Sequence, residues 1–201
     1  MPHRFRALTL SLAFAAACGP GDEPASESPP ADPIATPVAA ETAATAPSAT
    51  DVAYGLAEWG LGPLRVGMTE EEARAALGGA WSPLAADGET EGCRYARSAA
   101  LPPGVLVMLD SGRVRRVEVD SGATATAAGA RIGDSAERVR QLYPGLREGP
   151  HKYTAGKYLV ALPGAPADTV HRIVFETDSA GTVTRFRGGA LPHVEYVEGC
   201  S

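Results

Sequence analysis

The chain has 201 residues, of which 44% are hydrophobic and 21% are charged, and its formal net charge is −6. This composition is typical of a globular protein and excludes a fibrous or wholly disordered chain. The acidic balance argues against nucleic acid as a partner, because it repels phosphate groups and no run of Lys or Arg interleaved with aromatic residues offers a local exception.

Residues 1–17 have the three-part layout of a secretory signal peptide. Arg4 and Arg6 supply the positive start, an apolar run follows, and three alanines precede Cys18. The apolar run is shorter than the roughly 20 residues that a membrane-spanning helix needs. We therefore expect the leader to be removed after export, which takes the formal charge to −8 because the leader holds two arginines and no acid.

The segment Ala15-Ala16-Ala17-Cys18-Gly19 resembles the lipobox of bacterial lipoproteins. The resemblance implies cleavage before Cys18 and acylation of its thiol, and Gly19 in place of Asp implies the outer membrane, facing the periplasm or the cell surface. Lipoproteins usually have Leu where this chain has Ala15. Ordinary signal cleavage, which would leave Cys18 as a free thiol, is the alternative.

Residues 18–52 are rich in Pro, Ala, Ser, Thr and acidic residues and contain no aromatic residue. Such a segment cannot bury enough apolar surface to fold, so we expect a disordered tether that reaches roughly 30 Å or more. Acyl chains on Cys18 would hold the protein on the membrane while the tether leaves the folded domain free to move.

Residues 53–201 are expected to form one domain with two related halves, at about 59–122 and 123–201. In the first half, Thr69 and Glu72 form a capping box that predicts the start of a helix, and Gly78-Gly79 predicts its end. The apolar stripe of this helix consists of Ala73, Ala76 and Leu77.

The second half repeats this pattern 66 residues later. Ile132-Gly133-Asp134-Ser135 aligns with Val66-Gly67-Met68-Thr69, with Ser135 as the helix cap and Pro144-Gly145 as the stop. Ile132 and Val66 are both expected to be extended. The apolar stripe of the second helix consists of Val139, Leu142 and Tyr143.

After each helix the apolar residues alternate, which predicts strands. Each half is expected to contain about three strands that end in a β-hairpin. The fold class is therefore α+β, with two tandem helix-plus-antiparallel-sheet repeats packed as one domain. The predicted strands are 93–98, 105–109 and 114–119 in the first half and 157–162, 172–177 and 182–187 in the second.

The stretch from Gly62 to Thr69, followed by Glu71-Glu72-Ala73 and Leu77-Gly78, resembles the helix-opening signature of two groups of proteins. These are the small lipoproteins of the outer-membrane β-barrel assembly machinery and the β-lactamase inhibitor protein, which is built from two tandem repeats. Residues 59–201 also resemble an uncharacterised family of bacterial lipoproteins that ends in Tyr-Val-Glu-Gly-Cys. These resemblances imply a fold but no activity.

Two further cysteines, Cys93 and Cys200, are expected to form a disulfide, because paired cysteines in an exported domain are usually structural. A bond that encloses a loop of this length contributes about 4 kcal/mol on the chain-entropy model. The alternative, a redox-active pair, has no Cys-x-x-Cys motif and no neighbouring His to support it.

The sequence contains no convincing catalytic motif, and we expect neither enzymatic activity nor a cofactor. The four histidines, His3, His151, His171 and His193, lack metal-ligand spacing. Gly60-Leu61-Gly62 is followed by Pro63 and does not match a dinucleotide-binding loop.

Two segments combine aromatic, imidazole and charged groups in expected loops, a mixture suited to protein recognition. The candidate binding residues are His151, Lys152 and Tyr153 in one segment and His193 and Tyr196 in the other. The alternative is that these side chains serve ordinary packing.

The leading hypothesis is a membrane-anchored, extracytoplasmic lipoprotein that binds an unknown envelope protein without catalysis, through these loops or an exposed sheet face. A structural role in cell-envelope assembly is the alternative. A third hypothesis, a small-ligand-binding protein or hydrolase, would gain support from a pocket that contains a histidine beside a carboxylate.

Overall fold

The computed structural model of the protein describes residues 54–84 and 92–200. The predicted signal peptide, Cys18 and the predicted tether lie outside the described residues. Within the described part, no helix has both the length and the apolar character that a membrane crossing needs.

The described residues form helices and antiparallel sheets, which confirms the α+β class. The strands of the first half are β1 (Leu56–Ala57), β2 (Gly60–Leu61), β3 (Leu64–Arg65), β4 (Trp81–Leu84), β5 (Cys93–Ser98), β6 (Val105–Asp110) and β7 (Arg113–Val119). Those of the second half are β8 (Arg147–Pro150), β9 (Lys157–Ala161), β10 (His171–Thr177) and β11 (Val183–Ala190). The helices are α2 (Glu70–Leu77), α3 (Ala136–Leu142) and the short 3-10 helix η1 (His193–Glu195).

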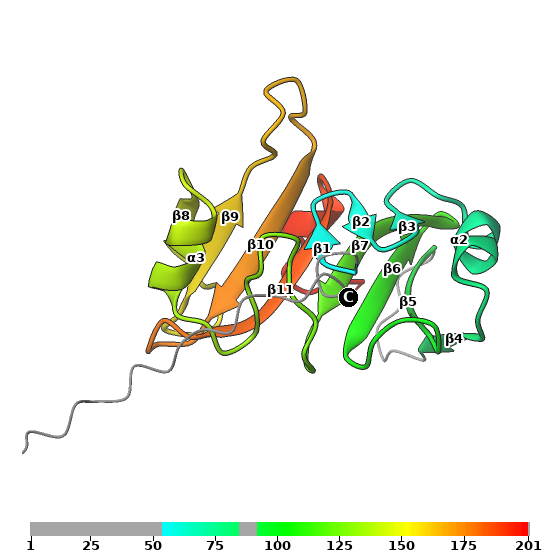
Figure 1. Cartoon of the computed structure of the whole chain (residues 1–201), viewed down its shortest axis with the longest axis horizontal. Coiled ribbons are helices and arrows are strands. Elements are labelled where there is room, and N and C mark those ends of the chain that lie inside the picture. Colours follow the sequence, from blue (N-terminus) through cyan, green and yellow to red (C-terminus); the bar gives the residue numbers. More distant parts are fainter. Residues whose placement is uncertain (1–53, 85–91, 201) are drawn as a thin grey trace, which may run out of the picture. The chain divides into compact units, whose positions relative to one another are not determined.

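Eight strands form one continuous sheet in the order β4-β5-β6-β7-β11-β10-β9-β8. Strands β7 and β11 pair with each other, so the two halves meet in the middle of the sheet and β4 and β8 are its edges (Figure 1). Each half thus contributes four strands after its helix. The expected number of three was wrong because the short edge strands β4 and β8 carry no clear alternation, and each includes a proline.

Both helices begin where their capping residues predict. The Thr69 hydroxyl accepts a hydrogen bond from Glu72 N at 3.2 Å, and Glu72 accepts one from Thr69 N at 2.7 Å. Gly78 ends α2 in the left-handed conformation at φ 63°. In α3 the Ser135 hydroxyl accepts from Arg138 N at 3.2 Å.

The segments before the two helices are attached to their hairpins in the same way. Gly67 N donates to Val114 O at 2.7 Å, and Gly133 N donates to Val183 O at 2.9 Å. Both glycines have positive φ, 93° and 92°. Val66 and Ile132, expected to be extended, lie instead in the turns that place these glycines.

One face of the large sheet carries the hydrophobic core. A single cluster of buried residues includes Ala73 of α2, Val139 of α3, and Val117 and Val119 of β7. The small β1-β2-β3 sheet, which the sequence analysis did not predict because each strand has two residues, adds three leucines to this core. These are Leu56, Leu61 and Leu64.

Side chains alternate between the two faces of a strand, so Arg116 and Glu118 of β7 lie on the face opposite the core. Register places Arg187 of β11 beside Glu118, and Glu176 of β10 beside Arg185. The second face of the sheet therefore carries a row of charged residues at its centre.

Candidate functional site

The last part of the chain, residues 191–200, runs over this charged face and is called here the C-terminal segment. Its helix η1 packs over β7, β10 and β11, and Val194 is fully buried there. His193 was expected in a loop but belongs to this helix. The centre of the second sheet face is therefore covered and is not the open binding face that the sequence analysis considered.

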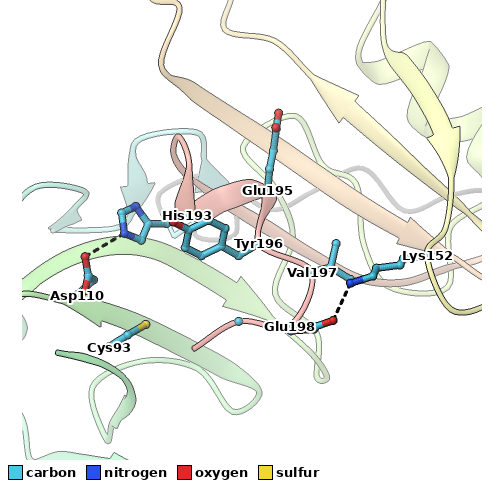
Figure 2. Close-up of a pocket in the computed structure, with 9 residues that line it drawn as sticks. Cys93, Asp110, Lys152, His193, Glu195, Tyr196, Val197 and Glu198 are labelled. Carbon is cyan, nitrogen blue, oxygen red and sulfur yellow. Dashed lines mark hydrogen bonds and ion pairs between the residues drawn. The ribbon is translucent and has the colours of Figure 1, made fainter. Parts of the chain in front are cut away.

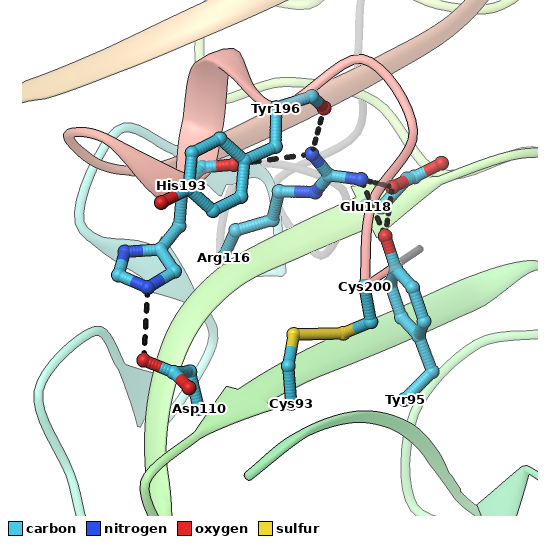
Figure 3. Close-up of a disulfide and its surroundings, with 8 residues drawn as sticks. All are labelled: Cys93, Tyr95, Asp110, Arg116, Glu118, His193, Tyr196 and Cys200. Atoms are coloured by element: carbon cyan, nitrogen blue, oxygen red, sulfur yellow. Dashed lines mark hydrogen bonds and ion pairs between the residues drawn. A yellow bond between two sulfur atoms is a disulfide. The ribbon is translucent and has the colours of Figure 1, made fainter. Parts of the chain in front are cut away.

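Two arginines hold the main chain of the C-terminal segment. Arg116 donates to His193 O at 3.1 Å and to Tyr196 O at 2.7 Å (Figure 3). Arg187 Nε donates to Val194 O at 2.6 Å. Both arginines are 2% exposed, so these hydrogen bonds are shielded from water and help to fix the position of the segment.

The two buried arginines are paired with two buried glutamates. Arg116 lies 2.6 Å from Glu118, and Arg187 forms an ion pair with Glu176. Burial alone would raise the pKa of Glu176, but the Arg187 guanidinium, with smaller contributions from His151 and Arg185, lowers that pKa below its ordinary value. Each buried arginine of the row thus lies beside a buried glutamate, and this pairing offsets the cost of removing the charges from water.

A disulfide joins Cys200 at the end of the segment to Cys93 at the start of β5, as the sequence predicts (Figure 3). Their Cα atoms are 5.4 Å apart. The neighbouring Tyr95 hydroxyl contacts Arg116 and lies 3.4 Å from Glu118. Burial, followed by the negative charge of Glu118, raises the pKa of Tyr95 to about 12.

Beside the C-terminal segment lies a pocket of about 470 Å³, called here the C-terminal pocket (Figure 2). It brings together Lys152 from the first candidate segment with His193 and Tyr196 from the second. The remaining lining residues are Cys93, Asp110, Glu195, Val197, Glu198 and Gly199.

Glu198, which follows the second candidate segment in the chain, lines this pocket and contacts the first candidate segment. Its carboxylate lies 2.7 Å from Lys152 Nζ and accepts a hydrogen bond from the Tyr153 hydroxyl. The Lys152 ammonium also lies 5.0 Å from the centre of the Tyr153 ring, within cation–π range. The hydrogen bond to Glu198, and then that to Tyr153, raises the pKa of Lys152.

The other ionisable side chains of the C-terminal pocket also have partners. His193 Nε2 lies 3.0 Å from an Asp110 oxygen, and Glu195 lies 2.9 Å from Arg172. The Tyr196 ring packs against the His193 ring at 5.1 Å between centroids. The aromatic rings at this surface are accessible, with Tyr153 61% and Tyr196 42% exposed, and so are the paired side chains of Lys152 and Glu198.

His151 and Tyr153 do not line the C-terminal pocket but a second cavity, and Tyr153 N donates to His151 Nδ1 at 3.1 Å. The His151 ring stacks on Tyr158 at 4.5 Å, and its Nε2 lies 3.2 Å from Glu176. The His151 side chain is 9% exposed and lines this second cavity together with Tyr153 and Thr154. His151 thus connects the loop to the buried charged row through Glu176.

Sequence reasoning missed Asp110, Glu198 and the buried charged row. Asp110 is the last residue of β6, and no local pattern indicates that it lies beside His193, which is 83 residues later in the chain. Within residues 54–84 and 92–200, no three His, Cys, Asp or Glu side chains are placed to hold a metal ion.

No model of a known protein family matches the sequence, and no curated protein matches it. Two solved structures are similar, each with a TM-score of 0.41 and 13% identity. One is the uncharacterized protein yfeY from Escherichia coli, covering 67% of this chain and 99% of that chain. The other is a DUF4309 family protein, YjgB, from Bacillus subtilis, covering 70% and 90%. Similarity at this level transfers no function.

Proposed function

We propose that this chain is an exported bacterial lipoprotein, anchored in the cell envelope through Cys18, whose folded domain binds another protein without catalysis. The observation that carries the binding role is the convergence of two segments about 40 residues apart on the C-terminal pocket. Exposed tyrosines around a pocket with paired charges are the composition that protein interfaces favour.

We propose further that the domain arose as two tandem repeats of the kind that the β-lactamase inhibitor protein contains. The matched attachments of Gly67 and Gly133 to their hairpins support this origin. The two hairpins also share an irregularity that supports this origin: each has a shift of register, between Met108 and Leu109 in one and between Glu176 and Thr177 in the other.

Lipid anchoring predicts the behaviour of a Cys18→Ser variant. Without the thiol no acyl chain can be attached, and a mature chain with a formal charge of −8 has little affinity for an anionic membrane surface. We expect the variant to move from the membrane fraction to the soluble fraction of fractionated cells. If the variant associated with membranes as much as the wild type does, the proposal of lipid anchoring through Cys18 would be wrong.

Partner binding is tested by photo-crosslinking in living cells. A benzophenone amino acid replaces Tyr153 or Tyr196, and the same replacement of Tyr54 is the matched control. Tyr54 is 47% exposed, comparable with the two test positions, but lies in a different pocket with Pro102 and Ala123. We expect one discrete protein adduct from positions 153 and 196 and none from position 54.

The same experiment addresses a second candidate function. The His193–Asp110 pair within a pocket of about 470 Å³ favours binding or hydrolysis of a small ligand. Equal adduct patterns at all three positions would remove the protein-binding role and leave the small-ligand role as the better explanation of the pocket.

A further inference from the structure

His151 is the first residue of the loop that joins β8 to β9, called here the 151–156 loop. Its Nδ1 atom accepts hydrogen bonds from Tyr153 N at 3.1 Å and from Thr154 N at 3.2 Å. An imidazole nitrogen accepts a hydrogen bond only while it carries no proton. The structure therefore holds His151 in its neutral form, with the ring proton on Nε2.

The other nitrogen of the His151 ring faces a carboxylate of the buried charged row. Nε2 lies 3.2 Å from Glu176 Oε2, and both side chains are 9% exposed. Because the pKa of Glu176 is lowered, its carboxylate stays ionised at every pH above its ordinary value of 4.5. It therefore accepts the Nε2 proton whether the imidazole is neutral or charged, and a second proton can enter the ring only at Nδ1.

Ionisable groups on several elements surround the His151 ring and its partner Glu176. They are Tyr158 of β9, Glu176 of β10, Asp178 after it, Arg185 and Arg187 of β11, and Lys152 and Tyr153 in the loop itself. The carboxylates favour a charged imidazole and the cations oppose it. The charges on β10 and β11 act on the ring whether or not the loop keeps its shape. The two amide donors oppose a proton on Nδ1 only while the loop keeps it.

The 151–156 loop presents two of the candidate binding residues, Lys152 and Tyr153, which both contact Glu198. Its base is held independently of the imidazole, because His151 N donates to Gly156 O at 3.1 Å and Pro150 pairs with Lys157. Loss of the contacts to Nδ1 would therefore free residues 153–154, called here the tip, and leave the base in place.

We propose that His151 is a positioning residue of the binding surface, whose neutral imidazole fixes the tip and whose protonation releases it. A proton on Nδ1 points at two N–H donors, so acid removes both hydrogen bonds and the Tyr153 ring loses its fixed position. This inference rests on the proposed function and adds its regulation, because a surface that is organised before contact binds its partner more tightly. The partner therefore binds best above the pH range in which histidine titrates.

NMR of the full chain tests this inference without a partner. At about pH 8 the nitrogen chemical shifts of His151 should be those of an unprotonated Nδ1 and a protonated Nε2. Amide hydrogen exchange, expressed as protection relative to the intrinsic rate at each pH, then follows the tip. As the pH falls to about 5, we expect the protection of the Tyr153 and Thr154 amides to decrease roughly two- to tenfold, as loss of one hydrogen bond predicts.

His171 provides a matched internal control. Val170 N and His171 N donate at 3.0 Å to Asp168, whose other oxygen lies 2.8 Å from His171 Nδ1. These two backbone hydrogen bonds are the main cause that lowers the pKa of Asp168 to about 2. The acceptor thus keeps its charge while the histidine titrates, and we expect the Val170 and His171 amides to keep their protection.

Two variants separate the role of the Nδ1 acceptor from that of packing. His151→Phe keeps an aromatic ring beside Tyr158 but has no acceptor, so the Tyr153 and Thr154 amides should have low protection at every pH. His151→Asn supplies a side-chain oxygen that accepts from amides two and three residues later, as Asn does in turns. It should restore the protection and remove its pH dependence.

Three outcomes would contradict the positioning role of His151. Wild-type protection in His151→Phe would show that the ring acts through packing alone. Constant protection of the tip in the wild type between about pH 8 and about pH 5 would show that protonation does not release it. A parallel decrease at Val170 and His171 would mean that acid loosens the domain generally.

Photo-crosslinking from position 153 supplies the functional arm. The adduct should decrease in cells that carry His151→Phe and recover in cells that carry His151→Asn, and an adduct undiminished in His151→Phe would overturn the regulation. The exchange result stands whether or not a partner exists, so failure of this inference and failure of the proposed function are distinguishable.

Discussion

Loss of the disulfide should lower the free energy of unfolding of the domain by about 4 to 5 kcal/mol. The bond joins residues 107 apart in sequence, so it removes much of the conformational freedom of the unfolded chain. The effect arises mainly in the unfolded state, and the native hydrogen bonds of Arg116 and Arg187 to the C-terminal segment survive.

Guanidinium chloride unfolding of Cys93→Ser, Cys200→Ser and the double variant measures this loss. All three should show the same decrease, because each removes the same covalent link. The dependence of the unfolding free energy on denaturant should increase, since an unfolded chain without the crosslink exposes more surface. A loss below about 1 kcal/mol in all three variants would contradict this account, because it would show that the crosslink removes little conformational entropy from the unfolded chain.

Local signals predicted the parts of the fold that depend on neighbouring residues. The caps at Thr69 and Ser135 and the hairpin strands follow from contacts a few residues apart, and the structure places them as expected. The pairing of β7 with β11 joins Val117 to Gly188 across most of the domain, and no local pattern specifies it. The sequence therefore predicted the helix starts and the hairpins but not the single sheet that contains both hairpins.

The candidate site was predictable in part for the same reason. The segments around Lys152 and Tyr196 attracted attention through their composition, but their meeting at Glu198 depends on the path of the C-terminal segment. Arg116 and Glu118 alternate with valines in β7, and this pattern normally indicates a strand with one face in the core and one face in solvent. Only the covering segment turns this ordinary polar face into a buried charged row.

The buried row implies a second large effect, from Arg187→Met. Arg187 is 2% exposed and has two partners, Glu176 and the carbonyl of Val194. Its removal leaves Glu176 buried with only His151 and the half-exposed Arg185 nearby, and leaves the carbonyl unpaired. We expect the free energy of unfolding at pH 7 to fall by about 3 to 5 kcal/mol, measured by urea unfolding.

A double-mutant cycle separates the ion pair from the lost packing. In Arg187→Met/Glu176→Met no buried charge remains uncompensated at this pair, so the double variant should recover roughly 2 kcal/mol or more relative to the sum of the single losses. Additive losses would instead assign the effect of Arg187 to its packing and to the Val194 carbonyl.

The pH dependence of the same variant follows from the lowered pKa of Glu176. A carboxyl whose pKa is lower in the folded protein contributes stability that is fully present above its unfolded pKa, near 4.5, and is lost as the pH falls through the folded value. Arg187 is the main cause of the lowering, so the difference between wild type and Arg187→Met should shrink as the pH falls below about 4.5. A difference that stayed constant down to pH 3 would mean that the ionised form of Glu176 gains no stabilisation from Arg187, and that the guanidinium acts on the fold only through the main chain of the C-terminal segment.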